Sequence, residues 1–123
     1  MKKFLVVDDS RLARKKIKTF LETMEYQLID EAEDGCIALE IFKENNYEYD
    51  YIVMDLEMPN MKGNEASIKM LNLNPNAKII LITSIIDKKE LIGALKIGVK
   101  KILQKPISFK MFEQTINELK AEK

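Results

Sequence analysis

Three aspartates, a threonine and a lysine stand at the ends of short apolar runs in this sequence of 123 residues. Asp8 and Asp9 follow Phe4–Val7, Asp55 follows Tyr51–Met54, Thr83 follows the run Lys78–Ile82, and Lys105 lies just beyond Lys101–Leu103. Carboxylates that are brought close together raise each other's pKa or require a cation. Three carboxylates in a chain with no histidine and one cysteine suit a hard cation, Mg²⁺ or Mn²⁺, rather than zinc.

The same set of side chains suits phosphoryl transfer. Mg²⁺ takes one or two carboxylates and completes its shell with water and phosphate oxygens. Lys105 and Thr83 are natural partners for the other oxygens of a phosphoryl group, and a carboxylate can act as the nucleophile that forms an aspartyl phosphate. Asp55 is the best candidate for that nucleophile because its strand is expected to be central, which leaves Asp8 and Asp9 to hold the metal.

Alternating strand-like and helix-like segments must position these residues. The strand-like runs are Phe4–Val7, a weaker Gln27–Glu31, Tyr51–Met54, Lys78–Ile82 and Lys101–Leu103. Helical spacing of apolar residues follows each run, at 13–24, 38–42, 64–73, 91–98 and 109–120. The alternation predicts an α/β fold, a doubly wound five-stranded parallel sheet of order 2-1-3-4-5 with helices on both faces. Ligands bind at the carboxyl ends of such strands, where the residues named above should meet.

Each of these polar residues also has a purely structural explanation. An aspartate or threonine after a strand often caps a helix or forms a turn, and a lysine before proline is often solvated. Ser10, Asp87 and Ser108 stand at predicted N-cap positions, and Asp87 with Glu90 resembles a capping box. The structural explanations are less satisfactory together, because four strands bring complementary groups to one edge.

Composition excludes several classes of protein. The 20 basic and 20 acidic residues balance, which gives no general attraction to nucleic acid or to an anionic membrane. No apolar run is long enough to span a bilayer and no signal peptide is visible, so a cytoplasmic protein is expected. We also expect it to be a monomer. The absence of histidine excludes a Ser-His-Asp site, and the single Cys36, expected to be a small buried helix residue, excludes an internal disulfide. The length indicates one domain, residues 1–123, with no output domain after the fifth helix.

Five short motifs occur in order along the chain. They are Val6–Ser10 (VVDDS), Glu33–Gly35 followed by Ala38 and Leu39, Val53–Pro59 (VMDLEMP) with Gly63, Ile82–Ser84, and Lys105–Pro106. In these motifs the sequence resembles the receiver domain of two-component response regulators, particularly the single-domain CheY-like proteins, over essentially its whole length. The resemblance implies a flavodoxin-like three-layer sandwich.

The resemblance also implies a role for each site residue. Asp55 is implied as the phosphoacceptor, modified by a sensor histidine kinase, a phosphotransfer protein or a small phosphodonor. Asp9, Asp55 and the carbonyl of Glu57 are implied as direct Mg²⁺ ligands, and Asp8 is implied to act through water. Thr83 and Lys105 are implied to contact the phosphoryl oxygens, and the Lys105–Pro106 bond is expected to be cis. Phosphorylation is implied to change a partner-binding face formed by the fourth helix, fifth strand and fifth helix, as in chemotaxis-type signalling.

The sequence departs from the family pattern at a few positions. Ile102 stands where the family usually has an aromatic residue that rotates together with the threonine, and Ile107 replaces a common aromatic after Lys-Pro. Glu57 and Ile85 stand at positions that resemble those tuning self-dephosphorylation in the family, and we expect a slow reaction and a stable phosphorylated state. The output face carries a basic cluster, with Ile85, Ile86 and Ile92 expected to be exposed; its lysines are Lys88, Lys89, Lys96, Lys100 and Lys101. Solvation is the default for such lysines, partner docking is the functional alternative, and nothing supports nucleic-acid binding.

Three other functions fit parts of the sequence. A degenerate receiver that works as a constitutive interaction module is favoured by Ile102 and opposed by the intact acid set. A phosphatase of the haloacid dehalogenase type is favoured by Asp55-Leu-Glu57, although that family places its nucleophile on the first strand. A flavodoxin-like cofactor binder needs a phosphate loop after the first strand, where Asp8 and Asp9 have the wrong charge.

Overall fold

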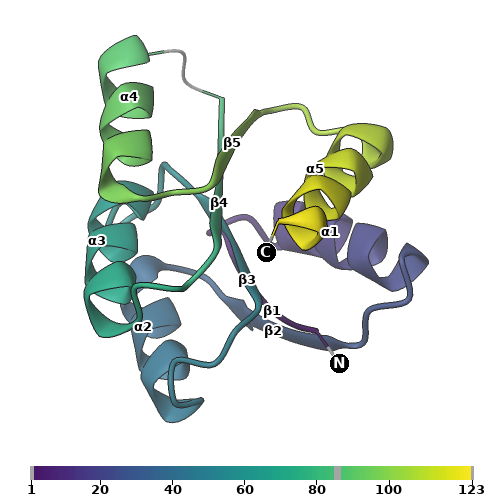
Figure 1. The fold of residues 1–123 in the computed structure, drawn as a ribbon, viewed down its shortest axis with the longest axis horizontal. Helices are drawn as coiled ribbons and strands as arrows, with labels where there is room; N and C mark the ends of the chain where they lie inside the picture. Colours follow the sequence, from purple (N-terminus) through teal and green to yellow (C-terminus); the bar gives the residue numbers. More distant parts are fainter. Residues whose placement is uncertain (1, 85–86, 123) are drawn as a thin grey trace.

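The computed structural model describes residues 2–84 and 87–122, in which five strands alternate with five helices (Figure 1). The strands are β1 (Lys3–Val7), β2 (Leu28–Ala32), β3 (Tyr51–Asp55), β4 (Ile79–Thr83) and β5 (Lys101–Gln104). The helices are α1 (Arg11–Thr23), α2 (Gly35–Glu44), α3 (Gly63–Leu73), α4 (Lys88–Ile97) and α5 (Phe109–Ala121). All strand pairs are parallel, and the predicted order β2-β1-β3-β4-β5 is confirmed.

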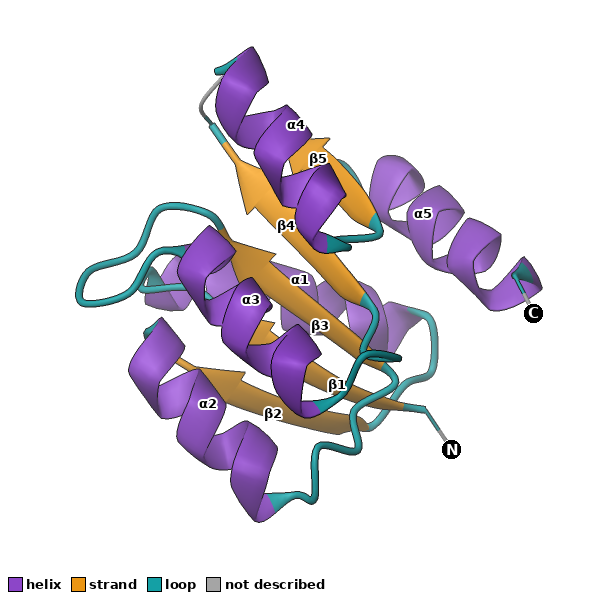
Figure 2. Cartoon of the chain, turned by 60° about the vertical axis from the view of Figure 1, so that its left-hand side comes forward, coloured by secondary structure: helices purple, strands orange, loops and turns teal. Residues whose placement is uncertain are grey.

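The helices cover both faces of the sheet, as predicted (Figure 2). One core contains side chains of α2, α3 and α4, and the other contains side chains of α1 and α5. Successive residues of a strand point to opposite faces, so Ile52 and Met54 enter the first core and Tyr51 and Val53 the second. Burial on both faces is the reason that the central strands read as unbroken apolar runs rather than as alternating ones.

Side-chain oxygens accept hydrogen bonds from backbone amides at the start of four of the helices. The predicted caps are confirmed: Ser10 Oγ accepts from the Ala13 amide, Ser108 Oγ from the Met111 amide, and Asp87 Oδ1 from the Lys89 amide. A capping box would use the amide of the third helical residue, and Asp87 bonds to that of the second. Asp34 caps α2 in the same way. These four helices each start within a few residues of a strand end, whereas α3 begins at Gly63, after a longer loop that follows Asp55.

Two predicted buried residues are exposed. Cys36 is the second residue of α2 and faces solvent, because the buried side of this helix is formed by Ala38, Leu39 and Phe42 instead. In α4 only Ala94 is buried, and the side chain of Leu95 is 52% exposed although its spacing predicted a place in the core. The helix is short and ends before Gly98, which adopts φ 119 as a left-handed C-cap. Among the described residues, no helix has both the length and the apolar character needed to cross a membrane.

Candidate functional site

The backbone remains paired beyond the ends of the strands. The Asp8 amide donates to the Ala32 carbonyl, and the Leu56 amide donates to the Ile82 carbonyl at 2.9 Å. The Lys105 amide donates to the Thr83 carbonyl at 2.8 Å. The first bond extends the pairing of β1 with β2, the second that of β3 with β4, and the third that of β4 with β5. Because β1 and β3 are also paired in parallel, all these strand ends lie at one edge of the sheet, where the sequence predicts that the polar residues meet.

The three aspartates form one cluster at this edge. A carboxylate oxygen of each of Asp8, Asp9 and Asp55 lies within 4.8 Å of the others. Asp8 and Asp55 are each only 6% exposed, whereas Asp9 is exposed to solvent. The cluster therefore has a buried base and an open side, through which an ion can enter.

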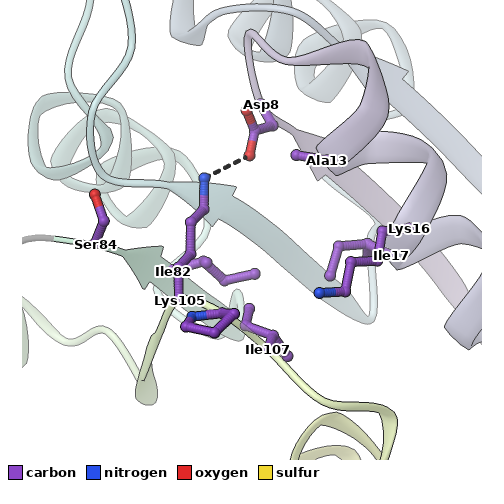
Figure 3. A pocket seen from close by; sticks show the side chains of 9 residues that line it. Asp8, Ala13, Lys16, Ile17, Ile82, Ser84, Lys105 and Ile107 are labelled. Carbon is purple, nitrogen blue, oxygen red and sulfur yellow. Dashed lines mark hydrogen bonds and ion pairs between the residues drawn. The ribbon is translucent and has the colours of Figure 1, made fainter.

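Lys105 lies between two of the aspartates. Its Nζ is 3.3 Å from Oδ2 of Asp8 and 3.6 Å from Oδ2 of Asp55, and Figure 3 shows it reaching toward Asp8. One ammonium group faces three carboxylates, so the cluster keeps a surplus of negative charge. The Asp8 carboxylate also accepts the Ser10 amide at 2.9 Å, which fixes it at the start of α1.

The pKa of Asp55 is raised from 3.8 to about 6, first by burial and then by the charge of Asp8. Lys105 and the Glu57 amide, which is 3.4 Å from Asp55 Oδ1, oppose this rise only in part. A cation placed among the carboxylates would favour the ionised form of Asp55 and would therefore oppose both causes of the raised pKa. The donors are oxygen atoms only, and they fit a hard cation such as Mg²⁺.

An apolar cavity of about 430 Å³ opens beside Asp8 and Lys105 (Figure 3). Its walls include Ile17 of α1, Ile82 of β4 and Ile107 after β5. Ile107 is 5% exposed and stands where an aromatic residue is common in the family that the sequence resembles. An isoleucine fills less of this space than an aromatic ring would. The cavity therefore lies beside position 107, where the sequence departs from the family pattern.

The other predicted features have mixed outcomes. Thr83 is 1% exposed, and the Lys105–Pro106 bond is cis as predicted. Ile102 is half-buried and packs against the core on the α2–α4 side.

Ile92 is 52% exposed as predicted, whereas Ile85 and Ile86 lie outside the described residues. Four of the five lysines of the basic cluster are exposed, and Lys101 is half-buried in an ion pair with Glu118 at 3.1 Å.

Two structural features near the site were not predicted. Arg14 Nη1 donates to the Asp8 carbonyl at 2.5 Å, and its Nε is 3.2 Å from Oε1 of Glu31, at the end of β2. Asp34 accepts a hydrogen bond from Asn60 in the loop after Asp55. The motif Glu33–Gly35 gave a signal for Asp34 without indicating its partner, and nothing in the sequence singles out Asn60 or Arg14.

Known proteins resemble this chain in sequence and in fold. The family model described as "Response regulator receiver domain" matches residues 4–117. The chemotaxis protein CheY of Thermotoga maritima is 31% identical over 118 residues, which cover 96% of this chain and 97% of that protein. A response regulator receiver domain protein of Clostridium thermocellum superposes with a TM-score of 0.88 at 28% identity, covering 97% of this chain and 94% of that one. CheY in the CheX–CheY–BeF₃–Mg²⁺ complex of Borrelia burgdorferi has the same fold, with a TM-score of 0.93 at 24% identity over 98% of this chain and 90% of that chain.

Proposed function

Because this chain belongs to the response regulator receiver domain family, we propose that it is a phosphorylation-controlled switch with Asp55 as the phosphoacceptor. The donor is a sensor histidine kinase, a phosphotransfer protein or a small phosphodonor. The observation that carries this proposal is the buried Asp55 carboxylate, which lies within 4.8 Å of two further carboxylates and 3.6 Å from the Lys105 ammonium. The set supplies a nucleophile, a place for a hard cation and a positive charge for the transferred group.

The side chains divide the work of the transfer. An Asp55 oxygen forms a bond to phosphorus while the bond from phosphorus to the donor breaks, and the donor keeps the electron pair. Lys105 moves from its carboxylate partners to a phosphoryl oxygen, and the Thr83 hydroxyl turns to another. Asp9, Asp55 and the Glu57 carbonyl would hold Mg²⁺ directly, and Asp8 would hold it through water. The metal, when bound, neutralises charge on the transferring group.

The signal leaves through the face formed by α4, β5 and α5. Ile92 and Leu95 of α4 are each 52% exposed there, beside exposed lysines. This combination suits a partner with apolar and acidic side chains. The Thr83 carbonyl accepts the Lys105 amide, so a shift of Thr83 toward the phosphoryl group displaces β5 directly. Such a route does not need a rotating aromatic at position 102.

Two further parts of the proposal concern lifetime and pathway. Glu57 is half-buried directly after the site, where its charge repels an attacking hydroxide. We therefore expect slow self-dephosphorylation and a long-lived signal. The relatives named as chemotaxis proteins make chemotaxis-type signalling the first pathway to test.

The direct test is phosphorylation by acetyl phosphate in the presence of Mg²⁺. Intact mass spectrometry should show one added phosphoryl group, and borohydride reduction followed by peptide mapping should place it on Asp55. Amide signals of α4 and β5 should shift in the NMR spectrum of the same sample. Absence of an adduct would overturn the switch and favour the constitutive interaction module, whereas repeated turnover of a phosphate ester would favour the phosphatase.

Asp9→Ala should abolish Mg²⁺ binding. The loss of an outer partner of a metal site typically costs about 10–100-fold in affinity, so the loss of a direct ligand should exceed about 100-fold. Isothermal titration calorimetry is the appropriate measurement, because the chain has no tryptophan to report binding by fluorescence. Glu33→Ala removes an exposed carboxylate after β2, outside the cluster, and should change the affinity less than about twofold. Equal losses in the two variants would contradict a metal site at Asp9.

A further inference from the structure

The loop between β3 and α3 is closed on itself next to the site. The Gly63 amide donates to the Leu56 carbonyl at 2.8 Å, which joins the two ends of the loop. At its tip, the Met61 amide donates to the Pro59 carbonyl at 2.7 Å across Asn60. Glu57, whose carbonyl is the proposed metal ligand, lies between these two bonds. The position of that carbonyl therefore depends on how the whole loop is held.

The turn at the tip is strained. Asn60 has φ 67, and a hydrogen bond across one residue with a positive φ is the rarer and less stable form of the three-residue turn. Asparagine tolerates this region better than most residues, but a strained turn persists only where its surroundings hold it. A contact outside the loop is needed for that purpose.

Asp34 supplies this contact from a separate element. Its Oδ2 accepts Nδ2 of Asn60 at 3.2 Å, and its Oδ1 accepts the Ile37 amide at 2.9 Å as the cap of α2. Asp34 is 8% exposed, and the Ile37 bond lowers its pKa, so the carboxylate is an ionised acceptor at neutral pH. One buried carboxylate thus ties the loop to the start of α2.

Packing reinforces the same connection. A Cβ atom at Gly35 would lie 3.0–3.1 Å from three side-chain atoms of Met61. Met61 is itself 8% exposed and belongs to the core under α2 and α3. The start of α2 therefore sits closely against the loop, and the Asp34–Asn60 bond lies at a packed junction rather than on a free surface.

We propose that Asp34 is a positioning residue for the metal site: through Asn60 it holds the loop after Asp55 so that the Glu57 carbonyl faces the ion. This inference rests on the proposed function, in which that carbonyl is a ligand. Asp34 touches neither the metal nor the phosphoryl group. Its effect should appear as a change in metal affinity and in loop mobility, with the helix cap left intact.

Two substitutions remove the Asp34–Asn60 hydrogen bond and leave the cap of α2 in place. Asp34→Ser keeps an oxygen that can cap α2, since serine and aspartate are equally good N-caps, but this side chain is too short to reach Asn60 as well. Asn60→Gly removes the side-chain amide and leaves a residue that adopts a positive φ readily. Ser108→Ala is the matched control, because it removes the cap of α5, which lies after β5 and outside the loop.

The experiment measures amide hydrogen exchange of residues 57–62 in the metal-free proteins and Mg²⁺ affinity by calorimetry. Asp34→Ser and Asn60→Gly should each speed exchange in the loop and weaken Mg²⁺ binding by roughly tenfold, the low end for loss of an outer partner. Ser108→Ala should lower overall stability without either effect.

The outcomes separate this inference from the function on which it rests. A wild-type protein that binds Mg²⁺ together with variants of unchanged affinity would overturn the positioning role and leave the switch intact. Loop exchange no faster than in Ser108→Ala would overturn it as well. A wild-type protein that binds no Mg²⁺ would overturn the proposed function and the positioning role together.

Discussion

Asp55→Asn is expected to abolish phosphorylation and, at the same time, to make the metal-free protein more stable. The amide has nearly the same shape as the carboxylate but cannot act as the nucleophile. It also removes a charge that is 6% exposed and close to Asp8, which are the two causes that raise the pKa of Asp55. A substitution that destroys the proposed activity should therefore strengthen the fold.

The raised pKa of Asp55 determines how the stability of the fold changes with pH. Because the folded protein holds the Asp55 proton more tightly than the unfolded chain, protonated Asp55 stabilises the fold below a pH of about 4. That contribution is lost as the pH rises through the folded pKa of about 6. The rise of the Asp55 pKa from 3.8 to about 6 corresponds to roughly 3 kcal/mol as an upper limit, so we expect a gain of about 1–3 kcal/mol for the variant at pH 8.

Urea denaturation with a chelator, at several pH values between 4 and 8, measures both effects. Wild type should lose stability over this range relative to Asp55→Asn, and Mg²⁺ should restore wild type while leaving the variant nearly unchanged. Asp87→Asn is the control, since it removes an exposed carboxylate but keeps an equally good cap for α4. A variant that is no more stable than wild type at pH 8 would contradict the electrostatic account of the site.

Gly63→Ala should be among the most damaging single-methyl changes in the chain. A Cβ atom there would lie 2.6 Å from the Asp55 carbonyl oxygen and 2.9 Å from Cα of Leu56. Both are backbone atoms, of Asp55 and of the residue that follows it, so they cannot move aside without displacing the Asp55 side chain. We expect a loss of about 3 kcal/mol in the free energy of unfolding and a marked loss of Mg²⁺ affinity.

Gly93→Ala provides a control in which the same change has the opposite sign. Gly93 lies inside α4, and a Cβ atom at this position would meet nothing within 4 Å. Alanine is the better helix former, so the variant should gain about 0.5–1 kcal/mol, or roughly 4 °C in Tm per kcal/mol. Thermal unfolding of both variants and of wild type tests the pair. A Gly63→Ala protein as stable as wild type would mean that the backbone around Gly63 leaves room for a methyl group.

The sequence by itself determined the order of the elements and the chemistry at the strand ends. Buried parallel strands must be apolar throughout, so the apolar runs of β1, β3 and β4 end visibly at the polar residues Asp8, Asp55 and Thr83. Parallel connections place all these ends at one edge, which brings the residues together without further information. Local caps such as Ser10 and Ser108 were readable for a similar reason, because the acceptor lies within three residues of its donor.

Only the tertiary structure decided which contacts join distant segments. The Asp34–Asn60 bond spans 26 positions, and neither residue type indicates its partner. Burial on α4 and at Cys36 was misjudged because periodicity shows that a helix has an apolar side, not how much of that side a neighbour covers. The spacing that excludes a methyl group at Gly63 and the raised pKa of Asp55 likewise depend on distances across the sheet edge, which the three-dimensional packing sets.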